Sequence, residues 1–475
     1  MTSSSKTYTL IASQLLAGGL LCASISGCMV GPNYHTPVVP APPAYKEPAS
    51  QPEAPVVAGS DWWTVFHDAT LNDLEKQAVA ANQDIQIAVA HVDQADATRR
   101  SIRSAQLPTV TADPSIGRTR EAQQRPNNGN TNGKASTYND IQLPLVLNYE
   151  IDAWGRIRRM VQSATASQQA TEADLRFVRL SVAASVATDY YNLREADAEI
   201  KLLETTIVDL ERGYEITSNQ FQRGIISELA VKQAQTILDQ TRARIEALHI
   251  QRSQSEHAIA VLLGRPASGF SIAESFTLSP PPVIPAGVPA DLLGRRPDIA
   301  AAERTAAAAS AQIGVAKAAY LPQLSLTGTA GYESTNPGAL LNWQNSIASL
   351  ASSAVAPIFT GGRLKANVDK AQASYRESVL QYEKTVLTSY QEDEDQLAAL
   401  HYLSRQFQSE NNAVEDATRA EEIATNRYKA GLVSYLDVVY AQQSLLANQE
   451  TSAQVQGQRL TATVGLIRAL GGSWQ

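Results

Sequence analysis

Polar and apolar residues follow two different periods along this chain. Residues 156–212, 225–263 and 363–430 contain neither Gly nor Pro, and Ala, Gln, Ser and Thr separate their thinly spaced apolar residues. This pattern predicts very long α-helices, because an uninterrupted helix over 363–430 would span about 100 Å. The Ala-rich faces permit close packing but the Leu content is low. A hollow or sheet-like helix array is therefore favoured, with a plain coiled coil as the alternative.

Shorter segments between the helices alternate between apolar residues and mostly polar ones. In one of them the apolar positions are Ile141, Leu143, Leu145, Leu147, Tyr149 and Ile151. We expect strands over about 107–117 and 138–151, and a second pair over about 321–333 and 343–359. Strands of about ten residues with one apolar face are typical of membrane-crossing β-sheets. Two soluble hairpins buried against helices are the alternative.

Two such hairpins cannot form a closed sheet within one chain. Aromatic residues that fit an interfacial belt lie near the strand ends: Trp154, Tyr332, Trp343 and Phe359. Lipid offers no hydrogen-bond partner to an open sheet edge, and the smallest membrane barrels have about eight strands. If the strands cross a membrane, the chain must therefore oligomerise. Two copies would supply eight strands and three would supply twelve.

The chain contains two copies of one large unit. Residues 216–229 (ITSNQFQRGIISEL) return as 423–436 (IATNRYKAGLVSYL). Self-similarity at this scale indicates a repeat architecture rather than several unrelated domains. We expect a first repeat over 61–270, a linker over 271–290 and a second repeat over 291–475.

The N-terminus has the features of a bacterial lipoprotein signal. A single charged residue, Lys6, precedes an apolar stretch, and Ile-Ser-Gly leads to Cys28. We predict a signal peptide over 1–27 and a lipid on the Cys28 thiol, with an ordinary cleaved signal as the alternative. Because Met29 rather than Asp follows the Cys, sorting to the outer membrane is favoured. The Pro-rich residues 28–60 are expected to form an extended tether.

Charge and cysteine content narrow the class of function. A formal net charge of −8 argues against nucleic acid as a partner and weakly favours a solute path that tolerates cations. Cys22 lies within the predicted signal, so Cys28 is the one thiol expected in the mature chain. An internal disulfide is therefore not expected.

No catalytic constellation is visible in the sequence. It contains no Gly-rich phosphate loop and no nucleophile elbow. The six His residues show no ligand spacing, and His67, beside a Trp pair, is interpreted as structural. Four consecutive acids at 392–395 point in different directions around a helix and are interpreted as a solvated face rather than a metal site. We expect no enzyme activity, no metal, and no cofactor other than the covalent lipid at Cys28.

Several short motifs occur in a fixed order along most of the chain. They are Cys28-Met-Val-Gly-Pro-Asn-Tyr34, Asp61-Trp62-Trp63, Arg295-Arg-Pro-Asp-Ile299, Ile313-Gly-Val-Ala316, Tyr428-Lys-Ala-Gly431 and Tyr435-Leu-Asp-Val438. In this order they resemble the outer-membrane efflux channels of the TolC type, specifically their lipoprotein branch, the NodT family. The resemblance implies a mainly α-helical fold with membrane β-strands and two tandem repeats. It further implies a trimer in which a twelve-stranded β-barrel continues into a long periplasmic α-helical barrel.

The same resemblance implies a function. Such a protein is the exit duct of a tripartite efflux pump, lipid-anchored in the bacterial outer membrane and extending into the periplasm. It would passively conduct drugs or other small molecules and contribute to multidrug resistance. Its expected partners are two further copies of itself, a periplasmic adaptor, an inner-membrane transporter and outer-membrane lipid.

Each repeat is expected to end in a helical hairpin tip, near 224–228 and 431–435. Both tips carry Gly-x-x-Ser, with Gly224 and Ser227 in the first and Gly431 and Ser434 in the second. Gly permits a left-handed turn and Ser can cap the returning helix, which is a complete structural explanation. The resemblance adds docking of the adaptor at these four residues.

The resemblance also implies a pore constriction at Asp437 and Tyr428. Three symmetry copies of Asp437 would form an acidic ring whose members raise one another's pKa and attract cations. A solvent-facing helix acid is the alternative. The first repeat departs from the pattern, because Ala230 stands where a second carboxylate can occur and Glu228 lies two residues earlier.

A periplasmic adaptor lipoprotein with a long coiled-coil hairpin is the competing function. Adaptors usually carry one helical hairpin between β-rich halves, whereas this sequence predicts two hairpins and membrane-like strands. An enzyme is a more distant third possibility.

Overall fold

The computed structural model describes residues 29–47, 61–122, 136–285 and 289–472. The predicted signal peptide and Cys28 lie outside the described residues. The chain divides into two compact units. One contains the β-sheet and the helix segments next to it in sequence, and the other contains most of the long helices.

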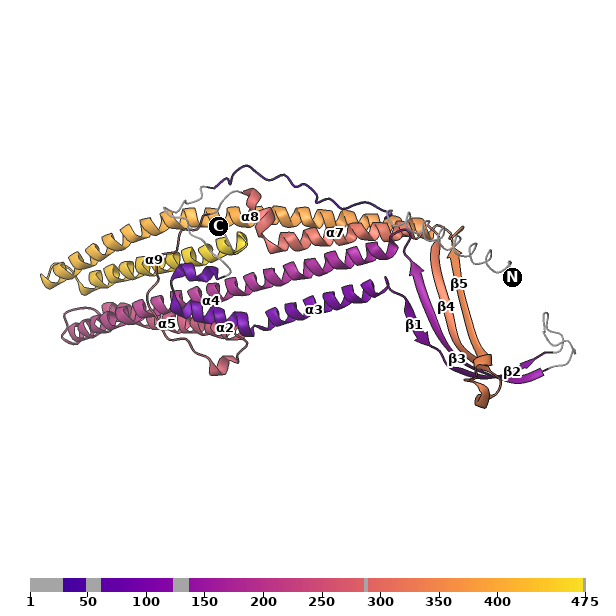
Figure 1. Cartoon of the computed structure of the whole chain (residues 1–475). Helices are drawn as coiled ribbons and strands as arrows, with labels where there is room; N and C mark the ends of the chain where they lie inside the picture. Colours follow the sequence, from indigo (N-terminus) through magenta and orange to yellow (C-terminus); the bar gives the residue numbers. More distant parts are fainter. Residues whose placement is uncertain (1–28, 48–60, 123–135, 286–288, 473–475) are drawn as a thin grey trace. The chain divides into compact units, whose positions relative to one another are not determined.

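The strands form one antiparallel sheet in the order β1-β3-β4-β5, and β2 also pairs with β3 (Figure 1). Their bounds are β1 (Thr109–Ala112), β2 (Ser115–Glu121), β3 (Ser136–Ile151), β4 (Gln323–Ser334) and β5 (Ser346–Val355). The central pair, β3 and β4, joins the two repeats, with Leu147 opposite Gly328. Within the described residues, β5 pairs only with β4, and β1 and β2 pair only with β3, so both edges of the sheet are open.

The first expected strand is broken into two at Asp113-Pro114. β1 and β2 keep the same register on β3, with Ala112 opposite Leu145 and Ser115 opposite Gln142. Pro144 lies opposite the break and, like Pro114, has no N–H to donate. Only the Asp113 N–H bonds across, to the Pro144 carbonyl at 3.2 Å, so the ladder is interrupted.

The alternation predicted for the strands produces two different sheet faces. Val110, Leu147, Gly328 and Leu350 lie in one row across the sheet, and their face carries most of the apolar side chains. Leu350 is 74% exposed, so this apolar face is uncovered in the described chain. Polar residues, such as Asn148 beside Thr327, lie on the opposite face. This arrangement disfavours the alternative of hairpins buried against helices.

The predicted long helices are confirmed, and three of the four helices of each repeat have equal lengths in the two repeats. The first repeat contains α2 (Ala69–Ala81), α3 (Gln83–Ser104), α4 (Arg156–Gln222) and α5 (Glu228–Leu262); the second contains α6 (Leu292–Arg295), α7 (Pro297–Ala318), α8 (Arg363–Lys429) and α9 (Tyr435–Ala469) (Figure 1). Helices α4 and α8 have 67 residues each, and α5 and α9 have 35 each, whereas α2 has 13 residues and α6 has 4. No helix in the described part of the chain has an apolar stretch long enough to span a bilayer.

Two glycines inside the long helices allow close contacts. A Cβ at Gly213 in α4 would lie 2.5 Å from the Tyr435 ring, and one at Gly457 in α9 would overlap the Glu195 carboxylate. Both helices continue through their glycine, although Gly costs about 1 kcal/mol relative to Ala in a helix. Close packing against these neighbours explains why glycine stands there.

The main hydrophobic core lies in the helical unit around an aromatic cluster. Trp62, Trp63 and Phe66 of the short 3-10 helix η1 (Trp62–Phe66) are buried, and Phe66 packs on Tyr191 with ring centroids 5.2 Å apart. Side chains from α2, α4, α5, α8 and α9 complete this core. The interpretation of His67 as structural agrees with its backbone, which ends η1 in a left-handed conformation at φ 54°.

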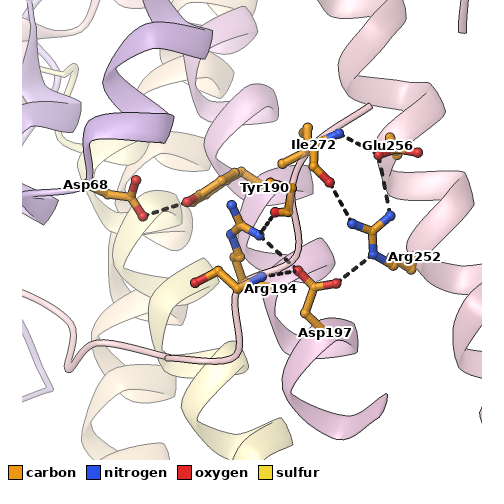
Figure 2. Close-up of polar contacts among 9 residues, drawn as sticks. Asp68, Tyr190, Arg194, Asp197, Arg252, Glu256 and Ile272 are labelled. Carbon is orange, nitrogen blue, oxygen red and sulfur yellow. Dashed lines mark hydrogen bonds and ion pairs between the residues drawn. The ribbon is translucent and has the colours of Figure 1, made fainter. Parts of the chain in front are cut away.

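A buried polar network fastens the segment that follows α5 to the helices (Figure 2). Asp197 on α4 is 1% exposed and accepts hydrogen bonds from Arg194, Arg252 and the backbone N–H of Ser275, at 2.9, 2.6 and 3.1 Å. Arg252 also donates to the Ile272 carbonyl at 2.8 Å. Asp197 therefore bonds both guanidinium groups, Glu256 supplies a second negative charge beside Arg252 at 3.4 Å, and together they fix the chain between them.

Replacing Asp197 with Asn should destabilise the helical unit. The variant leaves the buried Arg194 without its acidic partner and Arg252 with Glu256 alone, and breaking a buried ion pair costs about 3–5 kcal/mol. We expect a lower thermal unfolding midpoint by circular dichroism and faster proteolysis after residue 265. Asp239→Asn, in an exposed pair 3.7 Å from Arg242, is the matched control and should change little. Equal midpoints for the Asp197 variant and the wild type would contradict this assignment.

A second buried acid, Glu75 on α2, has no hydrogen-bond partner among the described residues. It is 0% exposed, and burial raises its pKa from 4.5 to about 9. The folded state therefore keeps a proton that the unfolded chain releases. Stability from this group is complete below pH 4.5 and is lost as the pH rises towards 9.

Glu75→Gln should remove this pH dependence. Relative to the variant, the free energy of unfolding of the wild type should fall by up to about 1.4 kcal/mol for each pH unit between pH 5 and 9. The thermal unfolding midpoint of the variant should therefore exceed that of the wild type by an amount that grows as the pH rises across this range. Glu204→Gln, on an exposed part of α4, should show no divergence. Parallel curves for Glu75→Gln and wild type would mean that the buried carboxyl is not protonated.

Candidate functional site

Each helical hairpin turns through a left-handed glycine. Gly224 follows α4 with φ 69°, and Gly431 follows α8 with φ 71°. In the first tip the Gly224 and Ile225 N–H groups donate to the carbonyls of Phe221 and Gln220, at 2.8 and 2.9 Å. The second tip repeats this pair of bonds, which satisfies carbonyl groups at the end of each helix.

The two tips differ in how the returning helix begins. Ser434 precedes α9, and its backbone N–H and its hydroxyl both donate to the Asp437 carboxylate, at 2.9 and 2.7 Å. Ser227 precedes α5 but makes no capping hydrogen bond with its side chain. Ala230 occupies the position equivalent to Asp437 and offers no carboxylate. The departure noted in the sequence is therefore a missing helix cap at the first tip.

Asp437 is exposed at the start of α9. The Ser434 hydroxyl holds the pKa of this carboxyl below its usual range, so in the single chain it is ionised at neutral pH. This direction is opposite to the shift expected for a ring of three acids. The capping bond from Ser434 lowers the pKa of Asp437 within one chain, whereas the repulsion expected in the ring would come from further copies of the chain.

Tyr428 links the second tip to the first. Its hydroxyl accepts a hydrogen bond from the Gln220 amide at 3.2 Å, and its ring meets Tyr435 edge-on with centroids 5.0 Å apart. A pocket of about 500 Å³ lies between the tips, lined by Gln220, Ala230, Tyr428 and Leu436 among others. All the predicted tip residues therefore lie at one end of the helical unit, and their roles in docking and constriction stay predictions.

Sequence analysis missed Gln220 and Tyr435 as contacts of Tyr428. Both occupy positions at which the two repeats differ: Gln220 corresponds to Arg427, and Tyr435 corresponds to Glu228. The sequence signal that could have indicated Gln220 and Tyr435 is the difference between the two repeats at these positions.

The interpretation of residues 392–395 as a solvated face was wrong for three of its four acids. Glu392 pairs with Arg296 at 2.7 Å, and burial raises the pKa of Asp393 to about 7. Glu394 accepts the backbone N–H groups of Lys46 and Glu47, at 2.7 and 3.1 Å. The run fastens the N-terminal segment and the start of the second repeat. Among the described residues, no cluster of His, Cys, Asp or Glu has the geometry of a metal site.

The capping difference between the tips is directly testable. Asp437→Asn should weaken the first turn of α9, and Ala230→Asp should strengthen the first turn of α5, because a capping box satisfies helix N–H groups. Hydrogen–deuterium exchange in peptides that cover these turns should increase about five-fold or more in the first variant and decrease in the second. Unchanged exchange in both would show that the carboxylate does not control the turn.

Comparison with known proteins places this geometry among efflux channels. The outer membrane efflux protein family matches residues 74–265 and 288–472. The toluene efflux pump outer membrane protein TtgC of Pseudomonas putida is 32% identical over 469 residues, which cover 97% of this chain and 96% of that protein.

Solved structures agree with the sequence comparison. The outer-membrane channel OprN has a TM-score of 0.87 and 29% identity, covering 94% of this chain and 100% of that one. The CmeC outer membrane channel of Campylobacter jejuni has a TM-score of 0.86 and 27% identity, over 94% of this chain and 96% of that one. The predicted fold class, mainly α-helical with two tandem repeats and a β-sheet, is confirmed.

Proposed function

Because this chain belongs to the outer membrane efflux protein family, as an outer-membrane component of an efflux pump, we propose that three copies form the pump's passive exit duct. The duct has no catalytic role. It carries drugs or other small molecules that an inner-membrane transporter delivers. The relative TtgC is named for toluene, which supports a small-molecule cargo.

The open edges of the sheet carry this proposal. β1 and β2 share one strand position, so each copy supplies four positions with unpaired edges at β1/β2 and at β5. Lipid cannot satisfy these edge groups, whereas an antiparallel neighbour can. Three copies close a twelve-stranded barrel. Its outer face is the exposed apolar row that includes Leu147 and Leu350.

The helix tips supply the gate and the adaptor site. In a trimer, the exposed Asp437 carboxylates approach one another and form a narrow acidic ring. The bond between Tyr428 and Gln220 holds the second hairpin against the first and keeps the ring closed. The periplasmic adaptor docks at the turns around Gly224, Ser227, Gly431 and Ser434, and frees the hairpins to separate.

The lipid at Cys28 anchors each copy to the outer membrane. The described segment that follows it is held by Arg159, which donates to the carbonyl groups of Val30 and Gly31 at 3.2 Å each. The competing adaptor function is disfavoured because each repeat supplies its own hairpin and the sheet exposes an apolar face.

Conductance in planar bilayers tests the duct and the gate together. We expect small single-channel conductance for the wild type and a several-fold increase for Asp437→Ala combined with Tyr428→Phe. The first change removes the acidic ring and the second removes the hydroxyl that bonds Gln220.

Two control variants separate the causes. Tyr402→Phe alters an exposed tyrosine elsewhere on α8 and should leave conductance unchanged. Ser434→Ala removes a capping bond but keeps the Asp437 charge, so it should open the pore less than Asp437→Ala. Equal single-channel conductance in the wild type and the double variant would refute the proposed gate but not the proposed duct. Failure of every variant to insert as a pore would refute the duct.

A further inference from the structure

A pocket of about 650 Å³ lies within the helical unit, far along the chain from the tip residues. Side chains from η1, α2 and α4 line it, together with the α6–α7 junction and the glycines that follow α9. This volume is in the range of sites that bind drug-sized molecules. None of the residues assigned to the gate, the adaptor site or the lipid anchor contributes to it.

The pocket combines an apolar floor with basic residues. Trp63, which is 5% exposed, Leu180 and Ala183 supply buried apolar surface. Lys76 on α2 and Arg176 and Arg179 on α4 are exposed lining residues.

These basic residues are not neutralised within the described structure. No hydrogen bond or ion pair joins Lys76, Arg176 or Arg179 to another described residue. Two further lining arginines are already paired: Arg295 with Asp291 at 3.2 Å, and Arg296 with Asp298 and Glu392 at 2.7 Å each. Asp61 is the one acid in the lining, so the pocket has an excess of positive charge.

We propose that this pocket binds an organic anion, in which a carboxylate or sulfonate is carried on a flat apolar body. Arg176 and Arg179 lie three residues apart on one face of α4 and bind the anionic group. The apolar body packs on Trp63 and Leu180. This function is separate from the proposed duct and does not depend on it.

Equilibrium dialysis of the purified full chain in lipid nanodiscs tests the proposal. The probes are 2-naphthoate and its neutral analogue 2-naphthamide, which share the apolar body. We expect saturable binding of one naphthoate per chain, at least about ten-fold tighter than the amide and weaker in high salt. Equal binding of the two probes, or no saturable binding of naphthoate, would overturn the proposal.

Variants locate the site. Arg176→Gln combined with Arg179→Gln should reduce naphthoate affinity at least about ten-fold. Arg405→Gln removes an exposed arginine of α8 outside the pocket and should have no effect. Naphthoate affinity that is unchanged in the double variant, or reduced equally in the Arg405 variant, would place binding elsewhere and overturn the assignment. Circular dichroism of each variant confirms its fold.

Discussion

The open edges of the β-sheet constrain the rest of this protein. Backbone N–H and C=O groups on the outer edges of β1/β2 and β5 have no strand partner within the described chain, and lipid provides none. The four strand positions of the described chain cannot close upon themselves, and for this reason the proposed duct requires further copies of the chain. The apolar row through Leu147 and Leu350 supports the same proposal, because exposed apolar surface of this kind is favourable where lipid replaces water.

The helical unit meets a different requirement, which is to keep long and weakly apolar helices in a fixed arrangement. Gly213 and Gly457 let neighbouring side chains approach α4 and α9 closely. The Asp197 network adds charge-assisted bonds that fasten the segment after α5, and the acids at 392–395 fasten the N-terminal segment. Polar contacts of this kind specify one arrangement where an Ala-rich surface alone would permit several.

The tips show how a repeated sequence produces unequal ends. Both turns depend on a left-handed glycine, but only the second returning helix is capped by a carboxylate, at Asp437. The second tip also reaches across to the first through Tyr428 and Gln220. The two tips are therefore not equivalent, because a carboxylate caps the returning helix of the second repeat and none caps that of the first.

The sequence alone determined the elements of this fold. Helix lengths follow from uninterrupted helical periodicity, and the two faces of the strands follow from the alternation of apolar and polar residues. The two repeats follow from the similarity between two segments of the sequence. Each of these patterns can be read from the sequence without knowledge of tertiary contacts. The strand break at Asp113-Pro114 was missed although Pro114, which has no N–H to donate, is a local signal of such a break. Tertiary structure decided the partners of Asp197, Glu392 and Tyr428, and the unpaired burial of Glu75. These outcomes depend on contacts between residues that are distant in sequence, and the periodicity of the sequence does not predict such contacts.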